Sequence, residues 1–238
     1  MSYRQQYDDQ LQLIRSNVVR MGNLATEMVR LAVDSALAGD LELASKVIAM
    51  DDEVDRLESE SLHRCVLTVV REAPVASDLR LLVSTIGVLG EIEKVADDAV
   101  KLARRATKLT GQFPGELKSA LAELGTHANQ SFASSLRLYA EYDAGLAREV
   151  IDADKAIDSE YKGARNRVFE MIKANPNATE SLVRTIEVFH ALEHVADHAV
   201  EIASRLQMHH NMSAINEVAN ESPARPPGTA AEGESTPE

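Results

Sequence analysis

A pair of acidic residues occurs twice in this sequence, once in each half. Glu93 and Asp97 stand four residues apart in the stretch EIEKVADDAV. Glu193 and Asp197 take the same places in ALEHVADHAV, 100 residues later. Four residues are slightly more than one helical turn, so on a helix the two carboxylates of each pair lie on one face. Like charges at this spacing repel, so each pair needs either a bound cation or free access to solvent.

A second kind of acidic pair precedes each of these stretches. Asp51 and Asp55 form it in the first half. Asp154 and Asp158 repeat it 103 residues later. With 38 acidic residues in 238, pairs at this spacing also arise by chance, and a solvated or arginine-paired groove is the plain alternative. The repetition on otherwise apolar faces favours four converging carboxylates in each half, which must bind cations or be neutralised by protons, Arg or Lys.

Any metal bound here would have carboxylate oxygens as ligands, which favours iron, manganese, magnesium or calcium. Four carboxylates from two helices can bridge more than one ion. His198 and its counterpart Asp98 directly follow the acidic pairs and rank as secondary ligands. His190 and His194 lie beside the second pair, and we expect them to be solvated helix residues rather than ligands.

Composition limits the possible functions. A formal net charge of −13 opposes binding to nucleic acid or to anionic lipid. Hydrophobic residues make up 45% of the chain but aromatic residues only 4%, which suits closely packed helices. No stretch reaches the roughly 18 apolar residues of a membrane span, and the single Cys65 cannot form an intrachain disulfide. We therefore expect a soluble, cytoplasmic protein that does not insert into a membrane.

Six long helices are expected to position the carboxylates, because apolar residues recur at steps of three and four along most of the chain. Gly39 ends the first helix, and Asp40 is a suitable N-cap for the second. Pro74 ends the second helix. Asp143 repeats the role of Asp40 in the second half. The segment TGQFPG, residues 110–115, is the clearest internal boundary.

The pattern predicts an all-α chain made of two tandem three-helix bundles, over residues 1–110 and 116–210. Pro114 is expected in the first turn of the fourth helix, and the NPN sequence at 175–177 should end the fifth. Residues 211–238 should form a disordered tail, because from Glu221 onward the chain is mainly Pro, Gly, Ser and Glu with little to bury.

Several motifs together resemble the PhoU family of phosphate-uptake regulators. They are APVASDLR and LGEIEKVADDA in the first half, with SLVRTIEV and HALEHVADHA in the second. The resemblance extends from about Tyr3 to Met208. It implies two three-helix bundles related by pseudo-twofold symmetry, whose acidic motifs hold polynuclear metal clusters, often of iron. Carried over by position, the implied metal ligands are Asp51, Asp55, Glu93, Asp97, Asp154, Asp158, Glu193 and Asp197.

The resemblance also implies a role. PhoU proteins repress the phosphate-starvation response when phosphate is plentiful, acting between the ATPase subunit of the phosphate ABC transporter and a sensor histidine kinase. The resemblance therefore implies a non-enzymatic adaptor and suggests a homodimer. Two positions depart from the repeat, since Asp98 matches His198 and Lys94 matches His194. Metal identity, nuclearity and occupancy are therefore expected to differ between the bundles.

A carboxylate-bridged di-metal enzyme, redox or hydrolytic, is the alternative function. Glu187 and His190, like Glu60 and His63, have the Glu-x-x-His spacing of ferritin-like helices. These motifs are not equivalent between the repeats, so we interpret them as coincidental. No G-x-x-x-x-G-K-[ST] loop for binding nucleotide phosphates occurs. A plain helical scaffold with an acidic surface is the third possibility.

Overall fold

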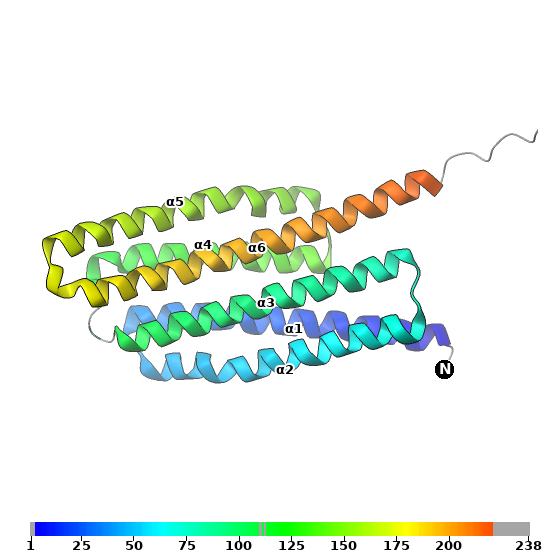
Figure 1. Ribbon diagram of the computed structural model, residues 1–238, viewed down its shortest axis with the longest axis horizontal. Coiled ribbons are helices and arrows are strands. Elements are labelled where there is room, and N and C mark those ends of the chain that lie inside the picture. Colours follow the sequence, from blue (N-terminus) through cyan, green and yellow to red (C-terminus); the bar gives the residue numbers. More distant parts are fainter. Residues whose placement is uncertain (1–2, 110, 112, 221–238) are drawn as a thin grey trace, which may run out of the picture.

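The computed structural model describes residues 3–109, 111 and 113–220, and its described part is built from helices. Figure 1 shows them as two bundles of three lying side by side, which confirms the predicted all-α architecture. The first bundle contains α1 (Tyr3–Ala38), α2 (Leu41–Glu72) and α3 (Ala76–Lys108). The second contains α4 (Lys118–Ala140), α5 (Ala144–Ala174) and α6 (Thr179–Asn220).

Local capping explains where α2 and α5 begin. The Asp40 carboxylate accepts hydrogen bonds from the backbone N–H groups of Glu42 and Leu43 at 2.8 and 3.1 Å, so the predicted N-cap of α2 is confirmed. The Asp143 carboxylate accepts from the N–H of Leu146 at 2.6 Å and caps α5 in the same way. Gly39 follows α1 with a positive φ of 70°, a conformation that glycine adopts without strain.

Two boundaries differ from the prediction. Pro114 does not lie in the first turn of α4, because it directly precedes a short 3₁₀ helix, η1 (Gly115–Leu117), from which α4 continues. α6 extends to Asn220 rather than ending at residue 210, so the first part of the predicted tail is helical. Residues 221–238 lie outside the described residues. A second short 3₁₀ helix, η2 (Pro176–Ala178), separates α5 from α6, where the NPN sequence predicted a break.

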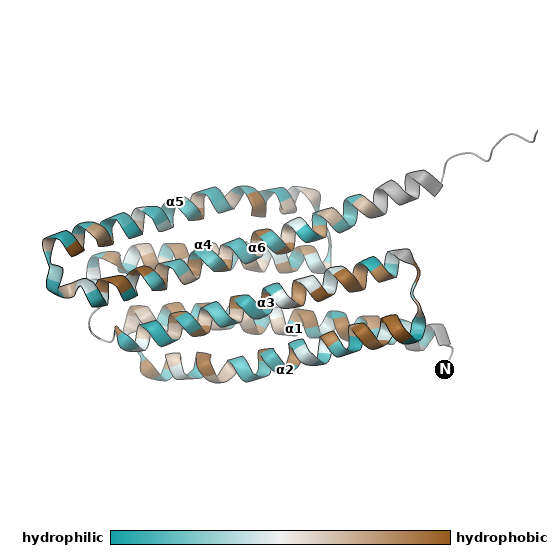
Figure 2. Ribbon diagram, in the orientation of Figure 1, coloured by the Kyte–Doolittle hydropathy of each residue, from teal (hydrophilic) through white to brown (hydrophobic). Residues whose placement is uncertain are grey.

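Both bundles share one apolar core. A single cluster of buried side chains joins residues of all six helices, and α3 and α6 pack extensively on each other. Figure 2 shows apolar and polar residues alternating along each helix, as expected of helices with one buried face. None of the helices in the described part of the chain combines the length and the apolar character that a membrane crossing requires.

Contacts between α1 and α4 reveal the pseudo-twofold symmetry. A Cβ atom added to Gly22 would lie 2.7 Å from the Leu136 side chain, and one added to Gly125 would lie 2.8 Å from the Val33 side chain. Gly125 stands 103 residues after Gly22, and Leu136 stands 103 residues after Val33. The same close contact is therefore made twice, with the two repeats exchanged, and glycine is what lets the helices approach.

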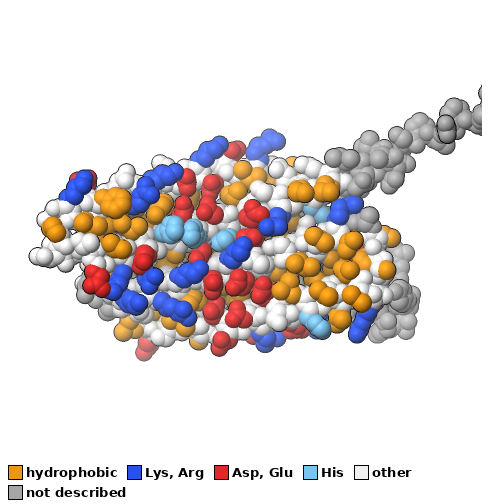
Figure 3. Space-filling view, viewed as in Figure 1, with side chains coloured by type: hydrophobic (Ala, Val, Ile, Leu, Met, Phe, Trp, Pro, Cys, Tyr) orange, Lys and Arg blue, Asp and Glu red, His pale blue; other side chains and the backbone are white. Residues whose placement is uncertain are grey.

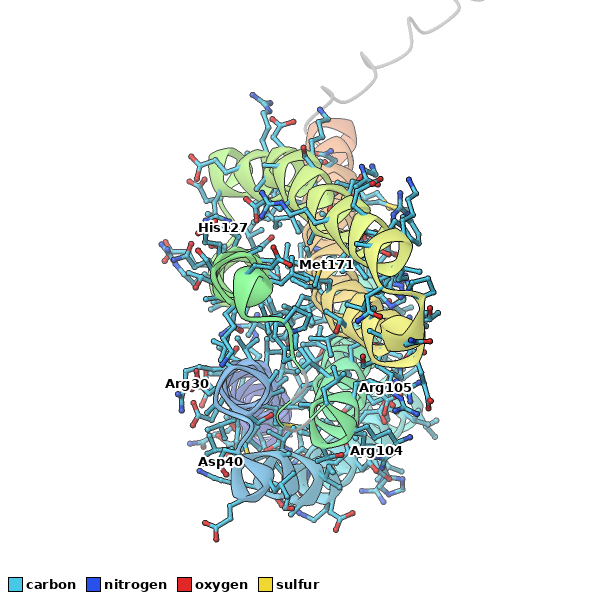
Figure 4. The ribbon with its side chains drawn as sticks, turned by 90° about the vertical axis from the view of Figure 1, so that its left-hand side faces the viewer. Arg30, Asp40, Arg104, Arg105, His127 and Met171 are labelled. Carbon is cyan, nitrogen blue, oxygen red and sulfur yellow. The ribbon has the colours of Figure 1, made fainter. Side chains whose placement is uncertain are left out.

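The contact between α3 and α6 obeys the same symmetry. Arg105 on α3 forms an ion pair of 2.7 Å with Glu187 on α6, and Figure 4 shows Arg105 where the two helices meet. Arg205 on α6 packs over Gly87 on α3, where an added Cβ would meet its guanidinium at 3.0 Å. Arg205 is the counterpart of Arg105, and Glu187 is the counterpart of Gly87, each 100 residues later. The two contacts are therefore related by exchange of the repeats, and α3 and α6 run antiparallel across a pseudo-twofold axis.

Candidate metal centre

Asp51 and Asp55 on α2 and Glu93 and Asp97 on α3 form the first acidic cluster. Burial raises the pKa of the Asp51 carboxyl, and the charges of Asp55 and Asp97 raise it further. Burial also raises the pKa of Glu93, and the Asp97 charge adds to this effect. The structure thus brings the four carboxylates close enough to repel one another. Figure 3 shows acidic side chains gathered midway along the face of the molecule that it presents.

Glu58 adds a fifth acidic side chain that the sequence interpretation missed. Its negative charge raises the pKa of Glu93, and burial raises its own pKa. It stands seven residues after Asp51, two helical turns along α2, and that spacing was the available signal. Tyr161 occupies the matching position on α5, so the second half lacks this carboxylate.

Basic side chains compensate the first acidic cluster only in part. Lys101 Nζ lies 3.7 Å from Asp97 Oδ2 but donates a shorter hydrogen bond, 2.9 Å, to Asp98 Oδ1. Arg104 counters the rise in the pKa of Asp51 without reversing it. The arginine-paired groove that sequence reasoning left open is therefore incomplete, and negative charge remains in excess.

Asp154 and Asp158 on α5 and Glu193 and Asp197 on α6 form the second acidic cluster. Burial raises the pKa of Glu193, and the charge of Asp197 raises it further. The pKa of Asp154 rises for the same reasons, burial first and then Asp197. Lys162 Nζ donates to Asp158 Oδ2 at 2.6 Å, so this cluster too is partly compensated. The sequence repeat therefore places four carboxylates together in the second bundle as it does in the first.

Histidines accompany only the second acidic cluster. His190 and His194 each offer a ring nitrogen, and Glu193 offers an oxygen, with these atoms all within 4.8 Å of one another. The group could hold a metal ion. The two side chains are also 49% and 41% exposed, as expected of solvated helix residues. Burial and the neighbouring His194 lower the pKa of His190, which favours the neutral, ligating form. Figure 3 shows histidine side chains between two groups of acidic side chains.

The two secondary candidates, Asp98 and His198, belong to a polar network between the bundles. His198 Nε2 lies 3.5 Å from Asp98 Oδ2, and His198 Nδ1 lies 2.9 Å from Glu91 Oε2. Burial favours neutral imidazole, but hydrogen bonds to Asp98 and Glu91 outweigh it and raise the pKa of His198. Lys94 and Arg205 also reach Glu91, at 3.1 and 3.5 Å. Sequence reasoning assigned no role to Glu91, whose counterpart is Ala191.

The donor sets of both acidic clusters fit hard cations. Each offers four carboxylates from two antiparallel helices. In the first cluster burial and neighbouring charges raise the pKa values of Asp51 and Glu93, and in the second they raise those of Asp154 and Glu193. A multivalent cation would relieve this repulsion and neutralise the buried charge. Thiolate is absent from both clusters, because the only cysteine, Cys65, is buried on α2.

The Glu-x-x-His motifs of the alternative enzyme do not form a similar set. Glu187 is engaged by Arg105 at 2.7 Å. Glu60 accepts from Arg64 at 2.8 Å and from Arg56 at 3.0 Å, on a helix of the other bundle. Both glutamates have arginine partners, so neither is an uncompensated carboxylate available to bridge two metal ions.

Known proteins resemble this chain in sequence and in fold. The family model described as the PhoU domain matches residues 18–106 and 121–206. The phosphate-specific transport system accessory protein PhoU homolog of Pseudomonas aeruginosa is 33% identical over 202 residues, covering 84% of this chain and 83% of that protein.

Solved structures agree with the sequence matches. The crystal structure of PhoU from Pseudomonas aeruginosa superposes with a TM-score of 0.83 at 29% identity, covering 87% of this chain and 99% of that one. The phosphate transport system regulatory protein PhoU from Streptococcus pneumoniae gives a TM-score of 0.79 at 21% identity, covering 87% and 97%, and shows the same fold. The domain match takes in both bundles and the identity extends over most of the chain, so the protein belongs to the PhoU family.

Proposed function

We propose that this protein is an accessory regulator of phosphate uptake that represses the phosphate-starvation response when phosphate is plentiful. The observation that carries the proposal is the 33% identity, over 84% of the chain, to a phosphate-specific transport system accessory protein. It acts as an adaptor between the ATPase subunit of the phosphate ABC transporter and a sensor histidine kinase. Relatives named as accessory or regulatory proteins support an adaptor rather than a catalyst.

The two acidic clusters supply the metal-binding part of this function. Iron is the first expectation, in polynuclear form, with manganese, magnesium or calcium as alternatives. Bound cations would join α2 to α3 and α5 to α6, because each acidic cluster draws two carboxylates from each helix of its pair. Metal would in this way stiffen the exposed face on which both clusters lie.

The protein acts in the cytoplasm as a homodimer, and it binds neither nucleic acid nor the membrane interior. The buried, unpaired thiol of Cys65 supports a reducing compartment. The net charge of −13 opposes nucleic acid. Sedimentation equilibrium tests the assembly, since a dimer has twice the monomer mass of 26.0 kDa. A single species at the monomer mass up to high micromolar concentration would refute the dimer.

Deleting the gene tests the regulatory role. In phosphate-replete cells the deletion should raise an alkaline phosphatase reporter several-fold, and the wild-type gene supplied in trans should restore repression. The combined Asp51→Asn and Asp55→Asn variant should restore it incompletely. Asp52→Asn is the matched control, because Asp52 lies next to Asp51 but is exposed on the surface of α2. An unchanged reporter in the deletion strain would refute the regulatory role.

An activity assay tests the adaptor assignment against the alternative enzyme. Purified protein loaded with ferrous iron should show no ferroxidase turnover, and it should not hydrolyse a phosphate ester. Turnover that disappears in the Glu93→Ala variant would show that the first acidic cluster catalyses a reaction, and the adaptor assignment would then be wrong.

A further inference from the structure

We propose that the second bundle holds a mononuclear site for a borderline divalent transition metal, of which Zn²⁺ is the representative, at His190, Glu193 and His194. The site has no counterpart in the first bundle. The inference rests on the proposed function only in that Glu193 belongs also to the second acidic cluster. It differs from the carboxylate clusters in its ligand chemistry, since two of its three donors are imidazoles.

The three donors converge from one helix. His190 and His194 are four residues apart on α6, so their rings stand on the same face, with centroids 4.0 Å apart. His190 Nε2 lies 3.7 Å from Glu193 Oε2, and His194 Nε2 lies 4.0 Å from the same oxygen. Zinc binds His nitrogen and carboxylate oxygen at about 2.0–2.2 Å, so small side-chain rotations bring all three donors to one ion.

A buried carboxylate from the other bundle lies near one of these histidines. Asp98 Oδ2 lies 3.7 Å from His194 Nδ1, and the Asp98 side chain is only 3% exposed. Metal-bound histidines usually direct their second ring nitrogen to a carboxylate or a carbonyl, which fixes the ring and its tautomer. A small rotation of the His194 ring would bring Nδ1 into hydrogen-bond distance of Asp98 and would leave His194 Nε2 for the metal. Because Asp98 is on α3, the site depends on the packing of the two bundles.

The first bundle cannot form this site. Gly90 and Lys94 stand where the second bundle has His190 and His194, although Glu93 matches Glu193. Lys94 brings an ammonium group that donates to Glu91 at 3.1 Å, so the matching position is taken by a permanent cation with no lone pair. The two halves therefore have the same carboxylates but different nitrogen chemistry, and a nitrogen-seeking metal should bind only the second.

Calorimetric titration of the metal-free full chain with Zn²⁺ alone tests the site. The wild-type protein should bind one Zn²⁺ tightly. His190→Ala and His194→Ala should each raise the dissociation constant of that Zn²⁺ ion by about 100-fold, because each removes a ligand. Asp98→Asn should raise it by about 10-fold, because loss of a supporting carboxylate costs about 10–100-fold in affinity. His127→Ala is the matched control and should bind as wild type, since His127 is another half-exposed helix histidine beside a glutamate, with Nδ1 2.9 Å from Glu160. Circular dichroism melts verify folding.

Grafting the two histidines into the first bundle tests sufficiency. The combined Gly90→His and Lys94→His variant should bind a second Zn²⁺ equivalent beside Glu93. This equivalent should bind about 10-fold more weakly than the first, because His198 stands where the second bundle's site has Asp98. A Cβ at Gly90 meets no atom within 4 Å, so the new side chain has room. No gain of an equivalent would overturn the claim that these two positions distinguish the halves.

The outcomes separate this inference from the proposed function. Tight Zn²⁺ binding that survives in the His190→Ala plus His194→Ala variant overturns the zinc site, whatever the acidic clusters do. Iron or manganese content that is unchanged by Asp51→Asn plus Asp55→Asn counts against the proposed carboxylate clusters instead. Loss of the tight Zn²⁺ equivalent in the histidine variants alone, with the first acidic cluster still binding manganese, supports both.

Discussion

His198 Nε2 lies 3.5 Å from Asp98 Oδ2, and these two residues occupy the same position in the two repeats. Near a pseudo-twofold axis a residue meets its own counterpart, so identical residues there would place like side chains together. Here one repeat has an acid and the other a base. The two bundles are joined by attraction at a point where duplicated aspartates would repel.

Replacing His198 with alanine should destabilise the protein by about 1–3 kcal/mol, because buried Asp98 and Glu91 would both lose a hydrogen-bonding partner. Urea unfolding followed by circular dichroism measures the change. His127→Ala serves as the control and should cost less, since His127 is half-exposed and water can replace its contact with Glu160. Equal losses in the two variants would mean that the network between the bundles adds no stability.

Glu93→Gln should stabilise the metal-free protein, by about 0.5 kcal/mol at pH 7, because it removes one charge from a set of mutually repelling carboxylates. The pKa of the Glu93 carboxyl is raised in the folded protein. The folded protein is therefore more stable while this carboxyl is protonated, and it loses that stability as the pH rises through the raised pKa. The variant avoids this loss, and the difference from wild type should therefore disappear toward acidic pH. Thermal melts between pH 4 and 7 would show it.

Bound metal should make the wild-type protein more stable than the Glu93→Gln variant. Adding manganese or ferrous iron should raise the melting temperature of the wild-type protein more than that of Glu93→Gln, because a ligand that binds only the folded state stabilises it. Asp52→Asn again controls for the loss of one exposed negative charge nearby. An equal metal response in all three proteins would exclude Glu93 as a ligand.

Gly125→Ala should destabilise the protein by about 1–3 kcal/mol through overpacking, because the added Cβ would lie 2.8 Å from the stiff side chain of Val33. Combining it with Val33→Ala should recover part of the loss. Gly163→Ala on α5 is the matched control, where the new methyl group meets nothing within 4 Å and should be neutral or stabilising. Denaturant midpoints of the four proteins decide the matter. A loss that Val33→Ala does not relieve would mean that another contact causes it.

Cys65 should be nearly unreactive toward a thiol reagent in the native state. Its side chain is fully buried, and burial raises the pKa of the thiol to about 11. The unfolded thiol ionises near pH 8.5, so this group stabilises the fold fully below that pH and less as the pH rises toward 11. Ellman's reagent should label one thiol only after denaturation. Rapid labelling of the folded protein at pH 8 would contradict this.

Local signals in the sequence were sufficient for the six helices and for the starts of α2 and α5. Asp40 and Asp143 cap α2 and α5 as predicted, because an N-cap bonds N–H groups only two or three residues away. The four-residue spacing of each acidic pair likewise determines its common face, since helical geometry alone decides it. The end of α6 was misjudged, because no proline or glycine marks it before Asn220.

Only the tertiary structure decided what lies between the bundles. Glu91, Asp98 and His198 are far apart in sequence, and their network depends on the antiparallel packing of α3 on α6. In the sequence, Gly22 and Gly125 are simply residues that disfavour a helix. The structure shows that they are the positions where α1 and α4 approach each other closely. Hydrogen bonds within a helix join residues up to four apart, and a sequence read locally contains that information. Which helices meet, and at which side chain, follows from burying every apolar face at once, and that is a property of the whole chain.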